Sequence, residues 1–216
     1  MLGPSSLTPA ALPQPPSAFP VAGRLTAHTP CDPQRAEVER CIRQTYAQRY
    51  GALVPAFAPV LLALREGGQV LAAAGYRRAA DGPLFLESYL EAPVEQLIAA
   101  QAGRPVARAQ IVEVGHLAAP RRGEGRRLVQ LLGPFLLHEG FDWVVGTVTQ
   151  ELQLMLVRLG LVPLLLGPAH PDALGDQAQY WGSYYQHTPV VLAIHLRRSL
   201  RQFLARRVRT MTREAP

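Results

Sequence analysis

The sequence predicts an α/β (α+β) fold, with a mixed, mostly antiparallel sheet, helices on both faces and a central strand–glycine turn–helix unit. The chain has 216 residues, of which 48% are hydrophobic and 18% charged, as in a globular domain with a substantial core. Stretches with helical spacing of apolar residues alternate with short β-like runs bounded by glycine and proline. The central unit is expected in residues 111–132, where an apolar run passes through a Gly/Arg turn into a helical pattern.

The first half of the chain is expected to hold a helix, three short strands and a second helix. The first helix should have Asp32 as its N-cap and Pro33 at its first position, and should end at Gly51. The turn-forming segments "EGG" and "ADGP" separate the strands and favour an antiparallel meander. These strands are expected at residues 60–64, 70–76 and 84–87. The stretch "APVEQLIAAQAG" predicts a short helix closed by Gly103.

The second half is expected to alternate strands and helices. The segment "RAQIVEVGHLAA" predicts a fourth strand, followed by the helix "GEGRRLVQLLGPFLLHEG", which Pro134 should kink or split. A fifth strand, "FDWVVGTVT", precedes the helix "QELQLMLVRLG", which ends at Gly160. The segments "LVPLLLG" and "TPVVLAIHL" predict closing strands, and "RRSLRQFLARRVRTM" a basic amphipathic helix.

The chain therefore divides into a Pro-rich flexible arm at residues 1–29, one domain at 30–196, and an Arg-rich amphipathic C-terminal helix at 197–216. The net charge is +6, and every basic residue is arginine. Seven arginines and one acid lie in residues 197–216, so residues 1–196 are balanced at 15 basic and 15 acidic side chains. A neutral body argues against a nucleic-acid partner.

Other features of the sequence bear on the location of the protein and on metal binding. No apolar run is long enough to span a bilayer, and the N-terminus lacks the basic start of a secretory signal. We expect a cytoplasmic protein, with peripheral contact to an anionic membrane through residues 197–216 as a further option. Cys31 and Cys41 are expected to be free thiols, and no metal site is expected.

The segment 120–127, "PRRGEGRR", predicts an anion site. Gly123 and Gly125 have no Cβ and let a ligand approach the backbone, while the following helix offers unpaired N–H groups. Positive charge around the turn comes from Arg121, Arg122, Arg126 and Arg127. This charge favours a pyrophosphate or a phosphopantetheine phosphate as the ligand. The spacing matches neither a Walker loop nor a dinucleotide fingerprint. The alternative is that both glycines only admit the chain into the helix.

This order of elements resembles the acyl-CoA-binding core of the GNAT acyltransferase superfamily. The turn "PRRGEG" keeps the two glycines of that family's Q/R-x-x-G-x-G/A pattern but has Pro120 at the Q/R position, which weakens the case for a CoA pyrophosphate. The segment "LVRLGL" keeps Gly160 but has Leu156 where the family's general-acid tyrosine usually stands. The resemblance therefore implies that any general acid comes from elsewhere.

A closer resemblance covers about residues 36–196. The strings "LFLESYLEAPVEQLIAA", "IVEVGHLAA" and "WGSYYQHTPVV" resemble the thermostable hemolysin family, a GNAT-like group. That group is similar to the acyl-homoserine-lactone synthases, whose E-x-S-R motif aligns with "EVGH", where Gly115 and His116 replace Ser and Arg. The resemblance implies acyl carrier protein, or else acyl-CoA, as the partner that donates an acyl group. The acyl-phosphopantetheine donor is then a substrate, and no permanently bound cofactor is expected.

Four residues are candidates for catalysis. Glu113 lies in an otherwise apolar strand, where burial would raise its pKa toward that of a useful base; a structural ion pair, for example with Arg108, is the alternative. His116 should face away from Glu113 unless a bulge at Gly115 brings both to one cleft and exposes a backbone N–H to the thioester carbonyl. His116 could also be purely structural. The candidates for the missing acid are Tyr184 and Tyr185, for which core packing is the alternative.

Further residues are candidates for binding. Thr147 and Thr149 are expected on one face of the fifth strand, where they could bond a pantetheine amide, although β-branched residues are common in strands anyway. Glu87 and Glu91 flank Tyr89 and are expected to face the acceptor amine.

The sequence thus predicts an N-acyltransferase that moves a fatty acyl group from an acyl carrier protein or CoA thioester to an amine acceptor, in small-molecule or lipid-amide biosynthesis. Two alternatives stay open: a membrane-active, haemolysin-like protein acting through its basic helix, and a non-catalytic acyl-binding module. The C-terminal helix could dock an acidic carrier protein, bind anionic lipid, or simply be a solvated helix.

Overall fold

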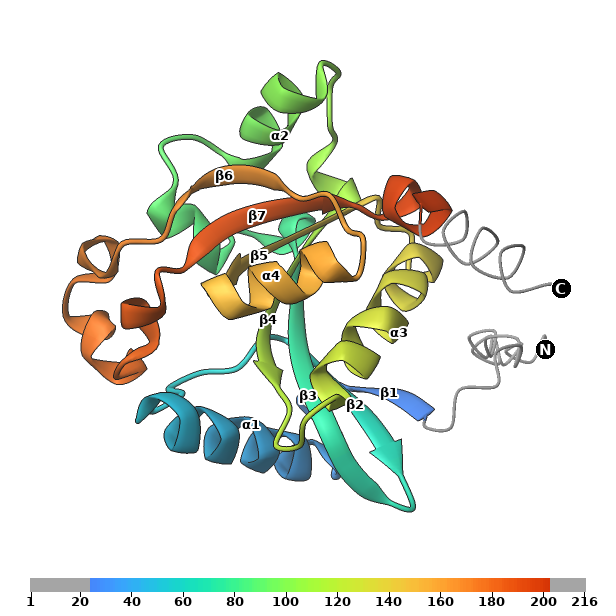
Figure 1. Ribbon diagram of the computed structural model, residues 1–216, viewed down its shortest axis with the longest axis vertical. Coiled ribbons are helices and arrows are strands. Elements are labelled where there is room, and N and C mark those ends of the chain that lie inside the picture. Colours follow the sequence, from blue (N-terminus) through green and yellow to red (C-terminus); the bar gives the residue numbers. More distant parts are fainter. Residues whose placement is uncertain (1–23, 203–216) are drawn as a thin grey trace, which may run out of the picture.

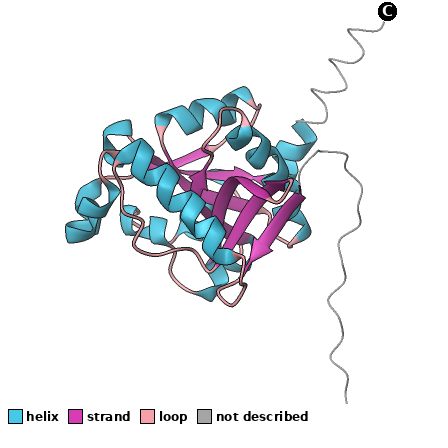
Figure 2. Ribbon diagram, turned by 90° about the horizontal axis from the view of Figure 1, so that it is seen from below, coloured by secondary structure: helices cyan, strands magenta, loops and turns pink. Residues whose placement is uncertain are grey.

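The computed structural model describes residues 24–202, which form a seven-stranded sheet covered by helices on both faces (Figures 1 and 2). The strand order is β1-β2-β3-β4-β5-β7-β6, and every neighbouring pair is antiparallel except β4 and β5. The strands are β1 (Arg24–His28), β2 (Val60–Glu66), β3 (Gln69–Arg78), β4 (Ile111–Ala118), β5 (Trp143–Val148), β6 (Leu164–Pro168) and β7 (Val190–His195). The predicted mixed, mostly antiparallel sheet is confirmed.

The helices divide between the two faces of the sheet. One face is covered by α1, which packs on β2–β4, and by α2, which packs on β4, β5 and β7. The other face is covered by α3 and α4. The α-helices are α1 (Arg35–Tyr50), α2 (Val94–Ala102), α3 (Glu124–His138) and α4 (Gln150–Arg158), with 3₁₀ helices at Ala79–Asp81, Phe85–Tyr89, Arg108–Gln110, Pro171–Trp181 and Tyr184–His187.

A further helix begins at residue 196, directly after β7, and its described part ends at residue 202. The expected helical tail beyond that point, at residues 203–216, lies outside the described residues. None of the helices in the described chain is long and apolar enough to span a bilayer.

Two expected boundaries near the N-terminus are wrong. Residues 24–28 belong to β1, which pairs with β2, so the expected flexible arm cannot include them; residues 1–23 lie outside the described part. Helix α1 begins at Arg35 rather than directly after Asp32. The Asp32 carboxylate accepts the backbone N–H of Gln34 at 2.8 Å, which closes a turn before the helix instead of capping it. Gly51 ends α1 in a left-handed conformation, as expected.

One expected strand is absent, and of the two outcomes expected at Pro134, a kink or a split, the split does not occur. Residues 84–87 do not form a strand but lead into the 3₁₀ helix Phe85–Tyr89, because the Glu87 carboxylate binds the backbone N–H of Leu84 at 2.8 Å and so closes a local turn. Pro134 does not split α3, which is continuous over Glu124–His138. The buried leucines Leu128, Leu132 and Leu136 lie in α3 on both sides of the proline and pack on the sheet. This packing outweighs the helical hydrogen bond that Pro134 cannot donate.

The central strands β4 and β5 pair over only a short distance and then separate. Their ladder contains Ile111↔Trp143, Val112↔Val144 and Glu113↔Val145, after which neither strand pairs with the other. At the point of separation a Cβ on Gly146 would lie 2.7 Å from the Val114 carbonyl oxygen, so glycine permits this close approach. The strands open toward the turn that leads from β4 into α3. The gap between them positions the candidate site.

Candidate active site

Three cavities meet where β4 leaves β5. We call them the basic cavity, of about 580 Å³, the aromatic cavity, of about 200 Å³, and the apolar cavity, of about 160 Å³. Val114 lines all three of them, and Gly115, His116 and Thr147 line both the basic and the aromatic cavity. Val114, the first residue of β4 beyond its pairing with β5, is therefore the junction of the three cavities.

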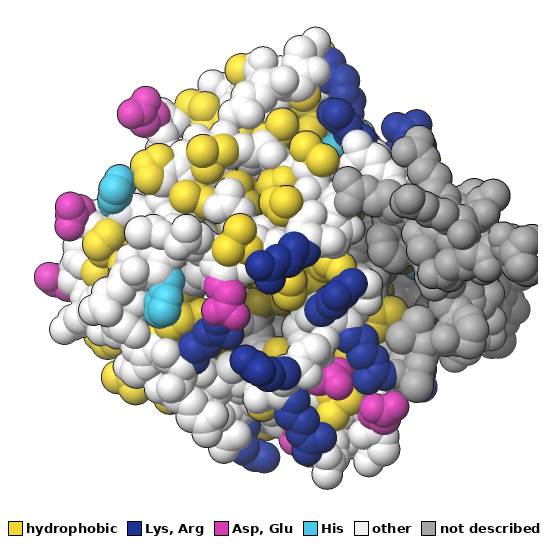
Figure 3. Space-filling model, viewed as in Figure 1, with side chains coloured by type: hydrophobic (Ala, Val, Ile, Leu, Met, Phe, Trp, Pro, Cys, Tyr) yellow, Lys and Arg dark blue, Asp and Glu magenta, His cyan; other side chains and the backbone are white. Residues whose placement is uncertain are grey.

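Apart from Arg127, every residue that the sequence predicted to bind a donor lines the basic cavity: Gly115, Arg121, Arg122, Gly123, Gly125, Arg126, Thr147 and Thr149. This cavity extends from the start of α3, along the opened part of β4, to the ends of β5 and α1. Arginine side chains surround a hollow on this face of the molecule (Figure 3). The one acid among its lining residues, Glu151, pairs with Arg49. The cavity is suited to an anion.

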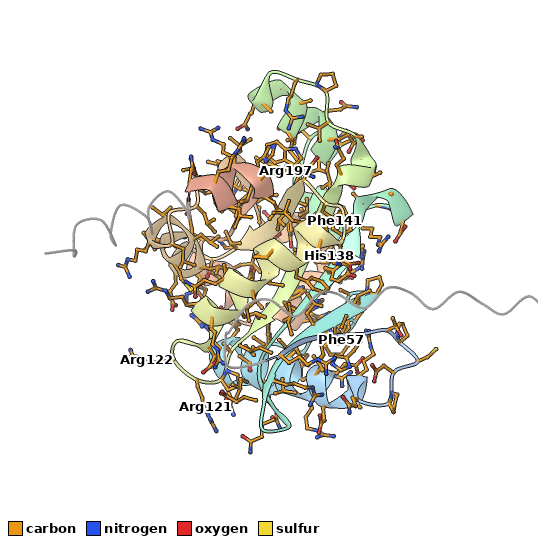
Figure 4. The ribbon with its side chains drawn as sticks, turned by 90° about the vertical axis from the view of Figure 1, so that its right-hand side faces the viewer. Phe57, Arg121, Arg122, His138, Phe141 and Arg197 are labelled. Carbon is orange, nitrogen blue, oxygen red and sulfur yellow. The ribbon has the colours of Figure 1, made fainter. Side chains whose placement is uncertain are left out.

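The start of α3 has backbone N–H groups available to bind such an anion. Gly123, the residue before the helix, has φ +89°, and no side chain caps the helix. Arg121 and Arg122 project outward from the loop that leads into α3 (Figure 4), whereas Arg127 pairs with Glu66 and Glu124 at 3.4 Å. The expectation that Arg127 adds to the anion site is therefore wrong, while the uncapped N–H groups fit a phosphate.

A β-bulge shapes the middle of β4. Gly75↔Gly115 and Ala73↔Ala118 are successive register pairs of β3 and β4, so β4 carries one more residue than its partner between them. His116, inside this segment, has φ +54°. Because the bulge reverses the usual alternation of side chains, Glu113 and His116 both line the aromatic cavity. The bulge predicted around Gly115 is present.

Glu113 is buried, with 9% of its surface exposed. Its carboxylate accepts the backbone N–H groups of Phe85 at 2.9 Å and Leu86 at 3.0 Å. Burial raises the pKa of the Glu113 carboxyl, and these two hydrogen bonds oppose the rise. The alternative of an ion pair with Arg108 is wrong, because Arg108 pairs with Glu87 and Glu95. Glu113 thus combines a strengthened basicity with access to a cavity.

His116 is a neutral imidazole at pH 7, because burial lowers its pKa to about 4. Its Nδ1 atom is buried and has no hydrogen-bond partner in the described chain. The ring lies 5.7 Å from that of Phe57, measured between centroids. Nδ1 lies against Gly75, so the His116 side chain forms part of the cavity wall and is a weak base.

Tyr184 and Tyr185 both reach the site. The Tyr184 hydroxyl donates to the Thr147 carbonyl oxygen at 3.1 Å, and its side chain lines the basic and the aromatic cavities. Tyr185 lines the aromatic cavity and bonds the Tyr89 hydroxyl at 2.6 Å. Burial raises the pKa of both phenols. Either residue can supply a proton while neutral, and Tyr184 lies at the junction.

The two threonines differ in their surroundings. Thr147 lies in β5, and its Oγ1 is buried without a partner in the described chain. Thr149 lies one residue beyond β5 and caps α4, because its hydroxyl accepts the Leu152 N–H at 3.4 Å. The expectation that both lie within the strand is wrong for Thr149. Thr147 lines the basic and the aromatic cavities, and its hydroxyl is the one without a partner.

Glu87 and Glu91 line none of the three cavities, so their expected contact with an acceptor is wrong. Glu87 pairs with Arg108 at 2.7 Å and accepts the N–H groups of Leu84 and Val94, and Arg108 lowers its pKa to about 2. Glu91 is exposed at a bend before α2. Glu87 stabilises the segment between β3 and α2 rather than binding a ligand.

The apolar cavity lies between the sheet and helices α3 and α4, and Leu200 of the C-terminal helix also lines it. Leu156, at the position of the usual GNAT tyrosine, is 6% exposed and points into this cavity. Such a lining favours an apolar ligand group, for example a hydrocarbon chain. No cluster of residues able to hold a metal ion occurs within residues 24–202, and Cys31 and Cys41 are free thiols.

Sequence reasoning missed most of the aromatic cavity. Its walls come from separate segments, including Phe57 before β2, Arg77 in β3 and Trp181 near β7. None of these three residues carried a local signal; Arg77 stands next to Arg78, just beyond the strand expected at residues 70–76. The contacts that bring the aromatic residues together depend on the tertiary fold.

Comparisons with known proteins identify the class to which this fold belongs. LasI, an acyl-homoserine-lactone synthase, superposes with a TM-score of 0.55 at 14% identity, over 81% of this chain and 90% of its own. FeeM, an N-acyl amino acid synthase from uncultured soil microbes, gives 0.56 at 16% identity, over 86% and 97% of the chains. BjaI, a CoA-dependent acyl-homoserine lactone synthase solved with SAM and isopentyl-CoA, gives 0.56 at 17%, over 85% and 89%.

The fold is therefore the GNAT-like fold of these acyltransferases, as expected. Within that class, the family model "Thermostable hemolysin" matches residues 28–200, and the chain belongs to the thermostable hemolysin family. A search of curated proteins gives no match. The predicted family resemblance is confirmed.

Proposed function

We propose that this protein is an N-acyltransferase that moves a fatty acyl group from a phosphopantetheine thioester to an amine. One observation carries the proposal: the three cavities meet at Val114, beside the buried Glu113 carboxylate and the β4 bulge. Donor arm, acyl chain and acceptor each have a chemically suitable chamber. The fold shared with LasI, FeeM and BjaI supports an acyl-transfer role.

The donor would enter through the basic cavity. Its phosphate would bind the uncapped start of α3 and the nearby Arg121, Arg122 and Arg126. The pantetheine arm would then lie in the gap between β4 and β5, where the unpartnered Thr147 hydroxyl can bond an amide. The acyl chain would continue into the apolar cavity. Acyl carrier protein and CoA both present this phosphopantetheine arm, and the geometry fits either one.

The reaction forms a carbon–nitrogen bond and breaks the thioester carbon–sulfur bond. Glu113 would take a proton from the amine as the nitrogen attacks the carbonyl, a role that its raised pKa suits. A bulge leaves backbone groups outside the regular ladder, and those at Gly115 and His116 would hold the developing oxyanion. Tyr184, at the junction, would return a proton to the departing thiolate.

Replacing Glu113 tests the proposal. We expect Glu113→Gln to reduce transfer by about 100-fold or more, because the amide cannot accept the amine proton. The measurement is intact-mass analysis of the products after incubation with acyl carrier protein or CoA thioesters and a pool of amines, which also names donor and acceptor.

The matched control is Glu91→Gln, an exposed acid that lines none of the cavities. It should leave transfer, donor affinity and the melting temperature unchanged. Glu113→Gln should keep its donor affinity but melt at a lower temperature, because the glutamine NH2 group cannot accept one of the two backbone hydrogen bonds from Phe85 and Leu86. Full transfer by Glu113→Gln would remove the proposed base. Donor binding without transfer by the wild type would indicate instead a non-catalytic acyl-binding module.

A further inference from the structure

The aromatic cavity contains one positively charged side chain, Arg77, and its guanidinium has little to bind. Its described hydrogen bond is a long one, 3.5 Å, to the Pro83 carbonyl oxygen, and it forms no ion pair with any residue in 24–202. The neighbouring arginine differs. Arg78 pairs with Glu139 at 3.6 Å and stacks over the Phe141 ring at 5.6 Å. Arg77 is therefore available for an anionic ligand.

The position of Arg77 relative to Glu113 indicates what that ligand carries. The two residues are directly opposite one another in the antiparallel ladder of β3 and β4, so their side chains emerge side by side on the same face. Both line the aromatic cavity. Each oxygen of Glu113 already accepts one backbone N–H but has a second lone pair for an amine.

The remaining walls of the cavity indicate the rest of the ligand. Aromatic rings surround these two charged groups: Phe57, Phe85, Tyr89, Trp181, Tyr184 and Tyr185. The Phe85 and Trp181 rings lie 5.8 Å apart, which makes a continuous aromatic surface. Such a surface favours a large apolar or aromatic group.

We infer that the acceptor is an α-amino acid with a large apolar or aromatic side chain. Its carboxylate would bind the Arg77 guanidinium, whose planar fork matches a carboxylate. Its amine would lie beside Glu113, and its side chain among the aromatic rings. Because an α-amino acid carries its amine and its carboxylate on the same carbon, one molecule can engage both residues of the register pair. This inference rests on the proposed function, and its product is an N-acyl amino acid plus the free thiol.

The test compares amino acids with amines that differ only by the carboxylate. L-phenylalanine, L-leucine and L-tryptophan are each paired with the corresponding decarboxylated amine: phenethylamine, isoamylamine and tryptamine. We expect the wild type to acylate at least one amino acid with a KM about 30-fold below that of its amine, the effect expected from losing a charged hydrogen bond.

The Arg77→Gln variant should raise the KM for the amino acid by a similar factor and leave the KM for the amine unchanged. The matched control is Arg78→Gln, the next residue on β3, whose side chain lies on the other face of the sheet. It should alter neither KM. A melting curve for each variant establishes that the fold is intact, and Arg77→Lys should restore part of the preference.

Two results would overturn the inference while leaving acyl transfer standing. One is equal use of an amino acid and its decarboxylated amine by the wild type. The other is a folded Arg77→Gln variant with an unchanged KM for the amino acid.

Calorimetric titration of the same amino acids into the protein separates this inference from the proposed function. Binding to the wild type that is lost in Arg77→Gln supports the acceptor site even if no donor is turned over. Absence of amino-acid binding together with absence of transfer overturns both.

Discussion

Two carboxylates close to each other in this fold, Glu87 and Glu113, have opposite chemistry. The Glu113 carboxylate accepts hydrogen bonds only from backbone N–H groups, and its burial raises its pKa above the usual value. In contrast, the Arg108 guanidinium lowers the pKa of Glu87 to about 2. The apolar strand around Glu113 was enough to predict its unusual state. Nothing local to Glu87 could show that its ion-pair partner lies 21 residues further along the chain. A contact of this kind is fixed only by the tertiary fold.

Glu87→Gln should destabilise the protein by about 2 kcal/mol at pH 7, because it removes charge-assisted hydrogen bonds to Arg108. The folded pKa is depressed, so this stabilisation is fully present above the unfolded pKa of about 4.5 and is lost as the pH falls toward about 2. Urea unfolding of wild type and variant between pH 7 and pH 2.5 measures the difference.

Glu91→Gln is the control for this experiment, since Glu91 is exposed and forms no ion pair within the described residues. A difference between wild type and Glu87→Gln that stays constant down to pH 2.5 would contradict the ion-pair account.

At the scale of elements, the strand–turn–helix unit could be predicted because its signals are contiguous, from the apolar β4 through Gly123 to the amphipathic α3. The separation of β4 from β5 could not, because it depends on register between strands joined through α3. Edge strand β1 was missed for a similar reason, since five residues beside a proline-rich stretch form a strand only by pairing with β2. Non-local pairing decided each of these features.

Gly146→Ala should destabilise the protein by about 1–3 kcal/mol, because its Cβ would lie 2.7 Å from the Val114 carbonyl oxygen, and a backbone atom cannot move aside cheaply. Val114 would be pushed out of place, so donor binding should weaken as well. Urea unfolding and donor titration measure the two effects.

The matched control is Gly167→Ala in β6, where the new Cβ would meet only the end of the flexible Leu90 side chain at 3.4 Å. Its free energy of unfolding should stay within about 0.5 kcal/mol of the wild type. Equal stability of both variants would show that β4 and β5 do not need glycine at their point of separation.

At the scale of the whole molecule, the expected boundary between domain and tail at residues 196 and 197 divides a packed segment. Ser199 is 7% exposed, and Leu200 lines the apolar cavity, so the start of the C-terminal helix belongs to the folded body. Arg197, well away from the Arg121 loop (Figure 4), pairs with Asp142 at 2.7 Å. A truncation that tests the basic tail should therefore begin at residue 203.

Removing residues 203–216 should leave transfer from acyl-CoA intact, because the proposed base Glu113, the bulge at Gly115 and the start of α3 at Gly123 all lie in the described chain. If the tail docks an acidic carrier protein, the truncation raises the KM for the carrier-bound donor alone. If the tail acts on membranes, leakage of anionic vesicles is lost while transfer is retained. Loss of acyl-CoA transfer in a folded truncated protein would contradict a catalytic centre confined to the described chain.

The short ladder between β4 and β5 has one further consequence. The seven-stranded sheet consists of two antiparallel blocks, β1–β4 and β5–β7–β6, which are joined by three residue pairs between β4 and β5. Beyond these three pairs, peptide groups of both blocks face a gap that an extended molecule containing amide groups can span. If the proposed donor binds there, its pantetheine arm would pair with both blocks like an extra strand, and we expect the donor-bound protein to be more stable than the ligand-free protein.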